Sequence, residues 1–430
     1  MANYHSQDII QTAMPEAPIL VLLPAPLAPF GSAELSLGRE DDPVVLGLRL
    51  TRRTFLAARR AGYSQVFFLE QNGYSTPWIA AVQDWRSLAA TFACSPTAPL
   101  VVAPAAILSE VDWLKQLAGT QIEPAAWASV PNRIVMLAPA SALEALLALD
   151  EETGMYDIGA AERCLARRFG SPVGIPLGID PLVVEAPTDV RFAERRLLRS
   201  LVKETDGFMA RHIERPISLR ISRRLAATAV TPNQMSAISI LVGLCGGPFF
   251  LSQSPFLQTI GALLFLAHSI LDGCDGELAR VRFQESRWGG VIDFWGDNVV
   301  HAVIFACMAV GWSRSASAPW PLWLGAAAVL GTVGAAGLVY WRLMRPKEGV
   351  SAQFTSVSTT PERPLARMLD AASRRDFIYL VLVLALVGRS NWFLLLAAIG
   401  APIYFFLVIF LAARERLLRA PKPSSGLVGE

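Results

Sequence analysis

Long apolar segments dominate the chain from residue 233 onward, and they constrain its fold more than any other feature. We expect six spans, near 233–252, 256–280, 289–312, 319–343, 376–388 and 392–412. Most reach the roughly 20 residues that a bilayer requires, although the fifth is shorter. Unpaired backbone groups are not tolerated in hydrocarbon, so these segments predict helices. The sequence therefore predicts a six-helix polytopic membrane domain over residues 233–413, followed by a basic cytoplasmic tail at 414–430.

The distribution of basic residues predicts how the spans are oriented. Lys and Arg gather in the loops after spans two and four and in the tail, whereas the opposite loops hold only Arg314 and Arg389. Residues 1–17 contain acids but no Lys or Arg, so no signal peptide is expected. By the positive-inside rule we expect an inner-membrane protein with both termini in the cytoplasm.

Acidic and small residues recur at fixed spacing at the edges of spans two and three: Asp272, Asp275, Gly276, Ala279, Arg280, Asp293 and Asp297. The first four fall at i, i+3, i+4 and i+7, so they share one helix face. Asp293 and Asp297 likewise share a face of the next helix. Gly289-Gly290 predicts a turn between the two groups. The two acidic pairs are therefore expected to meet at one point on the cytoplasmic side.

Four carboxylates that converge in this way predict a site for hard divalent metals. The group contains no thiolate or imidazole set, so one or two Mg²⁺ or Mn²⁺ ions are the expected occupants. Two such ions, about 3.5–4 Å apart, would clamp a diphosphate. Gly276 and Ala279 leave room for a ligand, and Arg280 can bind a phosphate in bidentate fashion. Taken singly, these residues also fit a paired acid, small-residue helix packing and a positive helix-end anchor.

The whole pattern, Asp-x-x-Asp-Gly-x-x-Ala-Arg, eight residues, then Gly-x-x-x-Asp-x-x-x-Asp, resembles the signature of the CDP-alcohol phosphotransferases (CDP-alcohol phosphatidyltransferases). Every fixed position is filled. The resemblance implies that Asp272, Asp275 and Asp293 bind metal and the CDP diphosphate. It implies that Asp297, the last of the set, deprotonates an acceptor hydroxyl, which attacks the β-phosphorus and releases CMP.

Other site residues follow from the same resemblance. Thr231 and Asn233 would line the nucleotide site, with a helix cap as the competing role. An acceptor that carries a phosphate needs a basic pocket near Asp297, for which the candidates at the end of span four are Arg342, Arg345 and Lys347. Positive-inside anchoring explains those three residues equally well. The expected partners are a CDP-alcohol, a polar acceptor alcohol and membrane lipid, with no nucleic acid, and a homodimer is compatible with such a bundle.

Residues 1–195 predict a soluble α/β domain. Apolar runs indicate strands at 19–23, 44–50, 66–69, 100–103 and 133–137, with helices at 51–61 and 141–149. This alternation predicts a mostly parallel sheet with helices on both faces. The domain resembles the sugar-nucleotide type nucleotidyltransferases, most clearly in the stretch Val183–Val190.

The residues that such nucleotidyltransferases use are missing. The loop 24–31 contains three prolines, which lack the N–H groups that grip phosphates, and no lysine precedes Lys115. The strand ending at Ala103 runs into Pro104 and Ala105, where a metal-binding aspartate is needed. We therefore expect an inactive domain. An active N-terminal cytidylyltransferase remains the alternative.

Between the two parts, residues 196–232 form basic amphipathic segments that suit an anionic leaflet, although a solvated charged face is the simpler alternative. The stretch 203–234 resembles the segment leading into the membrane domain of archaeal-type bifunctional enzymes. In those enzymes a CDP-inositol-forming domain is fused to a di-myo-inositol phosphate phosphate synthase.

The sequence thus predicts an integral membrane enzyme that uses a CDP-alcohol of the CDP-inositol or CDP-diacylglycerol type. Two interpretations from other classes stay open: a divalent-cation carrier that uses the acidic cluster, and a membrane scaffold with a dead site.

Overall fold

The structure is a computed structural model that describes residues 17–24, 42–69, 78–93, 98–123, 126–131, 133–152, 158–175, 178, 180–202, 206–344 and 377–419. The chain divides into two compact units, Met1–Leu197 and Leu198–Glu430. Each unit has its own core.

The first unit is built on a seven-stranded sheet with the order β10-β8-β9-β6-β1-β4-β5. These strands are β1 (Ile19–Leu23), β4 (Gln65–Leu69), β5 (Ala80–Val82), β6 (Leu100–Pro104), β8 (Trp127–Val130), β9 (Ile134–Leu137) and β10 (Val173–Gly174). The fully buried strand β1 pairs in parallel with β4 and β6, while β9 runs antiparallel to β6 and β8. The sheet is therefore mostly parallel, as predicted.

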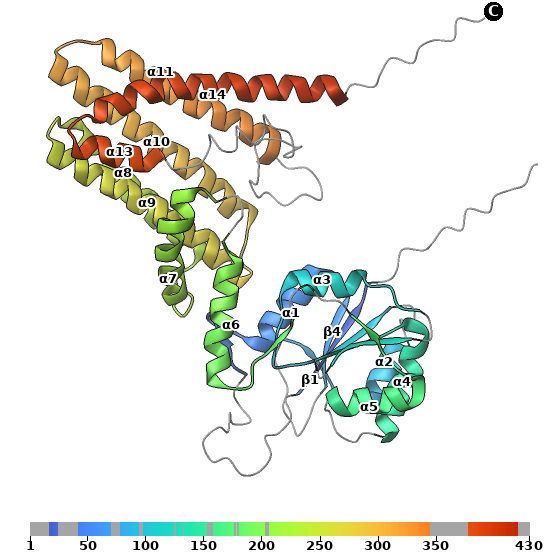
Figure 1. Ribbon diagram of the computed structural model, residues 1–430. Coiled ribbons are helices and arrows are strands. Elements are labelled where there is room, and N and C mark those ends of the chain that lie inside the picture. The colour runs from blue at the N-terminus through green and yellow to red at the C-terminus, as the bar shows by residue number, and fades with distance from the viewer. Residues whose placement is uncertain are drawn as a thin grey trace, which may run out of the picture. The chain divides into compact units, whose positions relative to one another are not determined.

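Helices cover both faces of this sheet: α1 (Leu50–Ala61), α2 (Trp85–Phe92), α3 (Val111–Gly119), α4 (Pro139–Glu152) and α5 (Ile158–Phe169), with α6 (Pro187–Ser200) following. Figure 1 shows α1 and α3 on one side and α2, α4 and α5 on the other. Apolar side chains of α2, α4 and α5 pack with β1 and β6 into one buried cluster.

Two details of the first unit differ from the sequence prediction. Residues 44–50 do not form one strand of the sheet; β2 (Val44–Val45) and β3 (Leu48–Arg49) make a separate antiparallel hairpin. Leu46 and Gly47 both have positive φ, 47° and 76°, which is the geometry of a tight hairpin turn. A second small pair, β7 (Ile107–Leu108) with β11 (Leu182–Val183), was not expected either.

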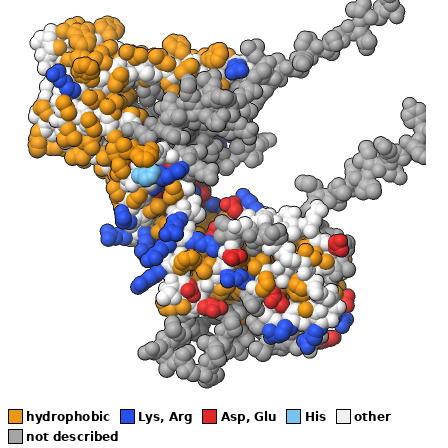
Figure 2. Space-filling view, in the orientation of Figure 1, with side chains coloured by type: hydrophobic (Ala, Val, Ile, Leu, Met, Phe, Trp, Pro, Cys, Tyr) orange, Lys and Arg blue, Asp and Glu red, His pale blue; other side chains and the backbone are white. Residues whose placement is uncertain are grey.

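The second unit is helical. Its elements are η1 (Ala210–Glu214), α7 (Arg215–Leu225), α8 (Pro232–Gly246), η2 (Gly247–Leu251), α9 (Pro255–Arg282), α10 (Arg287–Ala316), α11 (Trp320–Val339), η3 (Tyr340–Met344), α13 (Phe377–Leu386) and α14 (Ser390–Arg419). Apolar side chains of α9, α10, α13 and α14 meet in one core around Phe265, Val300, Val381 and Leu394. Figure 2 shows hydrophobic side chains over the outside of these helices, and Lys and Arg gathered over α7.

Within the described residues, five helices are long and apolar enough to cross a membrane: Pro232–Leu251, Pro255–Arg282, Arg287–Ala316, Trp320–Arg342 and Ser390–Arg414. They coincide with five of the six predicted spans. The remaining one corresponds to α13, which has ten residues. The residues just before α13 lie outside the described part, so a sixth span stays a prediction.

The connection between α9 and α10 also differs from the prediction. Phe283 takes a left-handed conformation with φ of 57° directly after α9, and Ser286 caps α10 by accepting a hydrogen bond from the Gly289 N–H over 2.9 Å. The turn is therefore at 283–286. Gly289 and Gly290 belong to the first turn of α10.

Candidate active site

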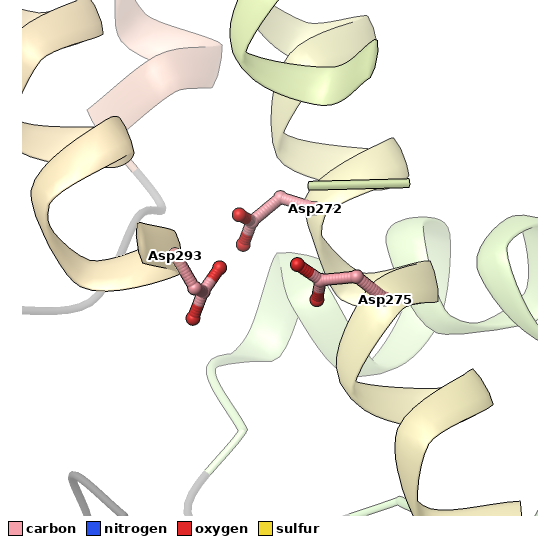
Figure 3. A group of neighbouring side chains, drawn as sticks. All are labelled: Asp272, Asp275 and Asp293. Atoms are coloured by element: carbon pink, nitrogen blue, oxygen red, sulfur yellow. The ribbon is translucent and has the colours of Figure 1, made fainter. Parts of the chain in front are cut away.

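Three carboxylates from two helices meet at one point. Asp272 and Asp275 on α9 and Asp293 on α10 each offer a ligand oxygen within 4.8 Å of the other two. Figure 3 shows the three side chains turned toward one another. Asp272 and Asp275 are buried, and Asp293 is half-buried. The structure therefore brings together three of the four aspartates that the spacing selects.

The donor set fits a hard divalent cation. All three groups are carboxylates, and Oδ1 of Asp293 is buried without a hydrogen-bond partner among the described residues. Carboxylate oxygens crowded in a protein interior repel one another unless a cation neutralises them. The cluster therefore has the composition of a Mg²⁺ or Mn²⁺ site.

Asp275 has additional support from α8. The Ser236 hydroxyl donates a hydrogen bond to Oδ2 of Asp275, and the backbone N–H of Gly276 donates to Oδ1. Ser236 was not predicted as a site residue, because a single serine in an apolar span has no distinctive spacing. Its role is visible only when α8 is packed against α9.

Asp297 follows Asp293 by one turn of α10 and does not belong to the three-carboxylate cluster found in the described part of the chain. Its residue is 9% exposed, and its Oδ1 lies 3.3 Å from Nε2 of His268 on α9. At Gly296 a Cβ atom would lie 2.2 Å from Cδ1 of Ile240, so the glycine allows α10 to approach α8 closely beside Asp297.

Arg280 lies next to the cluster on the same helix. A Cβ atom on Gly276 would lie 3.2 Å from its Nη1, so the guanidinium rests against the bare backbone of Gly276. Its Nε is buried without a hydrogen-bond partner within the described ranges. A guanidinium group with an unused donor beside carboxylates suits a phosphate ligand. Ala279, one residue earlier, is buried.

The remaining predicted site residues have mixed outcomes. Thr231 caps α8 in a capping box with Gln234, so the competing structural role is observed for this residue. Asn233 lies near the start of α10, where its Oδ1 would be 3.1 Å from a Cβ on Gly289. Arg342 lies on η3, whereas Arg345 and Lys347 fall outside the described residues.

A buried polar network on the other side of α9 escaped the sequence analysis. The side chain of Glu277 is 0% exposed and accepts hydrogen bonds from Arg215 Nη1 (2.8 Å), Ser218 Oγ (2.7 Å) and Ser222 Oγ (2.6 Å). Arg215 also donates to both oxygens of Asp206, over 2.8 and 3.0 Å. Burial opposes the charge on Arg215, but Asp206 and Glu277 outweigh it and raise the pKa of the guanidinium.

The hydrogen bonds to Glu277 change the interpretation of the basic segment at 196–232, which includes α7. A serine-bearing face of α7 is docked on α9, while Ile217 of α7 and Ile213 of the preceding η1 are 39% and 40% exposed. The sequence feature that indicates this docking is the i, i+4 pair Ser218 and Ser222. It was not recognised from the sequence alone, because the basic residues around the two serines were interpreted as an amphipathic membrane-surface pattern.

Comparison with known proteins identifies what the membrane part of the chain is similar to. Residues 229–413 match the family model for CDP-alcohol phosphatidyltransferase. A protein of Thermococcus kodakarensis named bifunctional IPC transferase and DIPP synthase is 38% identical over 153 residues, which is 35% of this chain and 33% of that one. A protein of Archaeoglobus fulgidus with the same name is 32% identical over 235 residues, 54% of this chain and 41% of that one.

The chain therefore spans about a third to two fifths of the length of these relatives. The crystal structure of Mycobacterium tuberculosis phosphatidylinositol phosphate synthase with CDP-DAG bound aligns with 46% of this chain and 93% of that one, at 18% identity and a TM-score of 0.32. The family match includes all four aspartates and the arginine of the predicted signature. The family match thus covers the membrane part, which is similar to the CDP-alcohol phosphatidyltransferases.

Proposed function

We propose that the protein transfers a substituted phosphate group from a CDP-alcohol to the hydroxyl group of a second alcohol and releases CMP. The observation that carries this proposal is the meeting of Asp272, Asp275 and Asp293 within 4.8 Å, inside a region that matches the family. The adjacent guanidinium of Arg280 supports it, because a diphosphate needs both cations and a hydrogen-bond donor.

Asp272, Asp275 and Asp293 would hold one or two Mg²⁺ or Mn²⁺ ions. When bound, the metal supplies positive charge to the diphosphate and to the departing CMP. The protein contributes the fixed carboxylates, the supporting Ser236 hydroxyl and the guanidinium of Arg280, which would bind a phosphate oxygen.

Asp297 is the proposed general base. It takes the proton of the acceptor hydroxyl as the acceptor oxygen forms a bond to the β-phosphorus of the CDP-alcohol. The bond from the β-phosphorus to the oxygen that bridges the two phosphates breaks, and CMP leaves with that electron pair. Support comes from the place of Asp297, one helical turn from Asp293 and largely shielded from solvent.

The donor is proposed to be of the CDP-inositol or CDP-diacylglycerol type. The relatives from Thermococcus kodakarensis and Archaeoglobus fulgidus, named for IPC transfer and DIPP synthesis, favour the first type. The acceptor is proposed to be a polar, phosphorylated alcohol. We also propose a site that faces the cytoplasm, on the side of the basic loops, and a homodimer as the assembly.

The first unit is proposed to be a nucleotidyltransferase-like domain without that activity. Its central strand β1 lies in a mostly parallel sheet, and β6 ends in Pro104, where a metal-binding acid would be needed. The prolines of the loop at 25–31 fall outside the described residues. Turnover of CTP with an alcohol phosphate by the full chain would instead support a bifunctional enzyme.

The test is CMP release by the purified full chain in detergent with Mg²⁺ or Mn²⁺. CDP-diacylglycerol and CDP-inositol are each offered with inositol, inositol phosphate or glycerol phosphate. Asp297→Asn should lower kcat by about 10²–10⁴-fold. Asp189→Asn is the matched control, since Asp189 accepts hydrogen bonds from the Glu185 and Ala186 N–H groups and from the Thr188 hydroxyl at the start of α6. Metal binding without CMP release from any pair would contradict the proposal and favour the cation carrier.

A further inference from the structure

A buried histidine links three helices at the candidate active site. His268 lies on α9, one turn before Asp272, and is 2% exposed. Its Nδ1 is 2.9 Å from the backbone carbonyl oxygen of Ser239 on α8, and its Nε2 is 3.3 Å from Oδ1 of Asp297 on α10. A carbonyl oxygen only accepts hydrogen bonds, so Nδ1 carries the proton of this pair. The imidazole therefore directs Nε2 at Asp297.

The surroundings hold the imidazole ring in this orientation. Gly243 lies one turn after Ser239 on α8, and a Cβ atom there would be 2.9 Å from Cγ of His268. The ring of Phe265 lies nearly parallel to the imidazole, at 10° and 6.3 Å between centroids. Phe265 itself is fully buried in the core of the membrane unit. The close approach of the imidazole to the backbone of Gly243 restricts rotation of the ring.

We propose that His268 is a positioning residue that fixes the carboxylate of Asp297 for its role as the base. The 3.3 Å ion-pair contact of Nε2 with Oδ1, which requires a proton on Nε2 as well as on Nδ1, engages one oxygen of Asp297 and leaves Oδ2 to meet the acceptor hydroxyl. The inference rests on the proposed function, because it assigns His268 its effect through Asp297. The signature motif does not contain this histidine, since the motif begins four residues later at Asp272.

The expected loss of rate when His268 is replaced follows from the geometry of the reacting groups. Misplacing a reacting group by about 1 Å can cost 10²-fold in rate. Asp297 follows Gly296, the position at which α10 approaches α8 closely. His268 supplies an independent anchor from a neighbouring helix.

Two substitutions separate the two polar contacts of the imidazole. His268→Asn places an amide near the position of Nδ1, so it keeps the bond to Ser239 and loses the contact with Asp297. His268→Gln places an amide near the position of Nε2, and this amide can either donate to Asp297 or accept from it. Positioning predicts that His268→Asn lowers kcat by about 10–100-fold. His268→Gln should retain most of the wild-type kcat.

The Michaelis constant for the CDP-alcohol should change by no more than about twofold in both variants, because donor binding does not use this contact. A role limited to packing predicts similar kcat values for Asn and Gln. Wild-type kcat in His268→Asn, or an equal loss in both variants, overturns the proposal.

Gln258→Asn is the matched control on the same helix. Gln258 is also 2% exposed and bridges helices, donating to the Ser252 carbonyl over 2.8 Å and accepting from Ser390 Oγ over 2.6 Å. It lies near the other end of α9, away from the aspartates. Its substitution should lower the melting temperature and leave kcat at the wild-type value.

A second measurement tests the pairing without catalysis. If the wild-type protein releases no CMP from any donor, the proposed function fails while the contact remains measurable. The melting temperatures of His268→Asn, Asp297→Ala and the double variant form a cycle. Positioning predicts that the double variant loses clearly less than the sum of the single losses, whereas additive losses would show that the two side chains do not interact.

Discussion

Arg215 on α7 donates a hydrogen bond to Glu277 on α9 over 2.8 Å, and the side chain of Glu277 is completely buried. Glu277 directly follows Gly276 of the signature motif. The helix that presents Asp272 and Asp275 to α10 is therefore held from another direction by charged and hydroxyl groups of α7.

Removing the positive charge of Arg215 should destabilise the membrane unit. Arg215→Leu leaves a buried carboxylate with only two serine donors, so we expect a loss of about 3–5 kcal/mol in the free energy of unfolding. Thermal unfolding in detergent measures it, with Arg220→Leu on the exposed face of α7 as the control. Adding Glu277→Leu should recover part of the loss. Equal effects of Arg215→Leu and Arg220→Leu would refute this account.

The support of Asp275 by Ser236 should appear in metal affinity. Ser236→Ala removes the hydroxyl that orients this carboxylate, so Mn²⁺ binding should weaken by about 10–100-fold. Electron paramagnetic resonance titration of the free ion gives the affinity. Ser313→Ala is the control, because that hydroxyl bonds only the Ala318 carbonyl in the loop after α10. Unchanged affinity in Ser236→Ala would rule out this supporting role.

The cap of α8 can be separated from nucleotide binding. Thr231→Ala should destabilise the first turn of α8 by about 1 kcal/mol, because it removes the side-chain acceptor of the Gln234 N–H. Thr231→Asp keeps a cap and should restore protection in hydrogen exchange. The Michaelis constant for the donor should stay unchanged in Thr231→Asp. A marked rise would show that Thr231 contacts the diphosphate, which the new negative charge repels.

The stability of the first turn of α2 should depend on pH. Asp84 accepts hydrogen bonds from the side chain and backbone of Ser87, which lower the pKa of its carboxyl group below the ordinary value. A lowered pKa in the folded state means that the ionised form contributes stability above the ordinary pKa. That contribution disappears as the pH falls through the lowered pKa.

Hydrogen exchange of α2 in the full chain, compared with Asp84→Asn at each pH, measures this dependence. The advantage of the wild type should shrink as the pH falls below the ordinary pKa of an aspartate, because the asparagine cap does not titrate. A wild-type advantage that is constant from pH 7 to pH 3 would contradict the assigned cause.

The sequence was most informative where chemistry follows helical spacing. Asp272, Asp275 and Asp293 are found together because their positions within α9 and α10 are set by the helical repeat and a short connection. The strand β1 could also be predicted from the sequence, since its five residues are all apolar, and the structure shows all five buried. The resemblance to the CDP-alcohol phosphatidyltransferases rested on these aspartates and the small residues and arginine spaced between them.

Contacts between helices distant in sequence could not be predicted in this way. Ser236 meets Asp275 across 39 residues, and Arg215 meets Glu277 across 62. No local periodicity specifies which turn of one helix faces which turn of another. The two glycines at 289–290 were misinterpreted for a related reason: at Gly289 the requirement is room beside Ser286 and Asn233, not a reversal of the chain.

The length of α9 bears on how a nucleotide reaches the carboxylates. With 28 residues it measures about 42 Å, against roughly 30 Å for the hydrocarbon layer. Asp275 lies about 30 Å along the axis from Pro255, which is about the thickness of that layer. A helix that begins at one boundary of the layer would therefore present Asp275 at the other boundary, where the phosphates of a cytidine diphosphate would stay in water. An acyl chain attached to the same molecule would remain in the bilayer throughout.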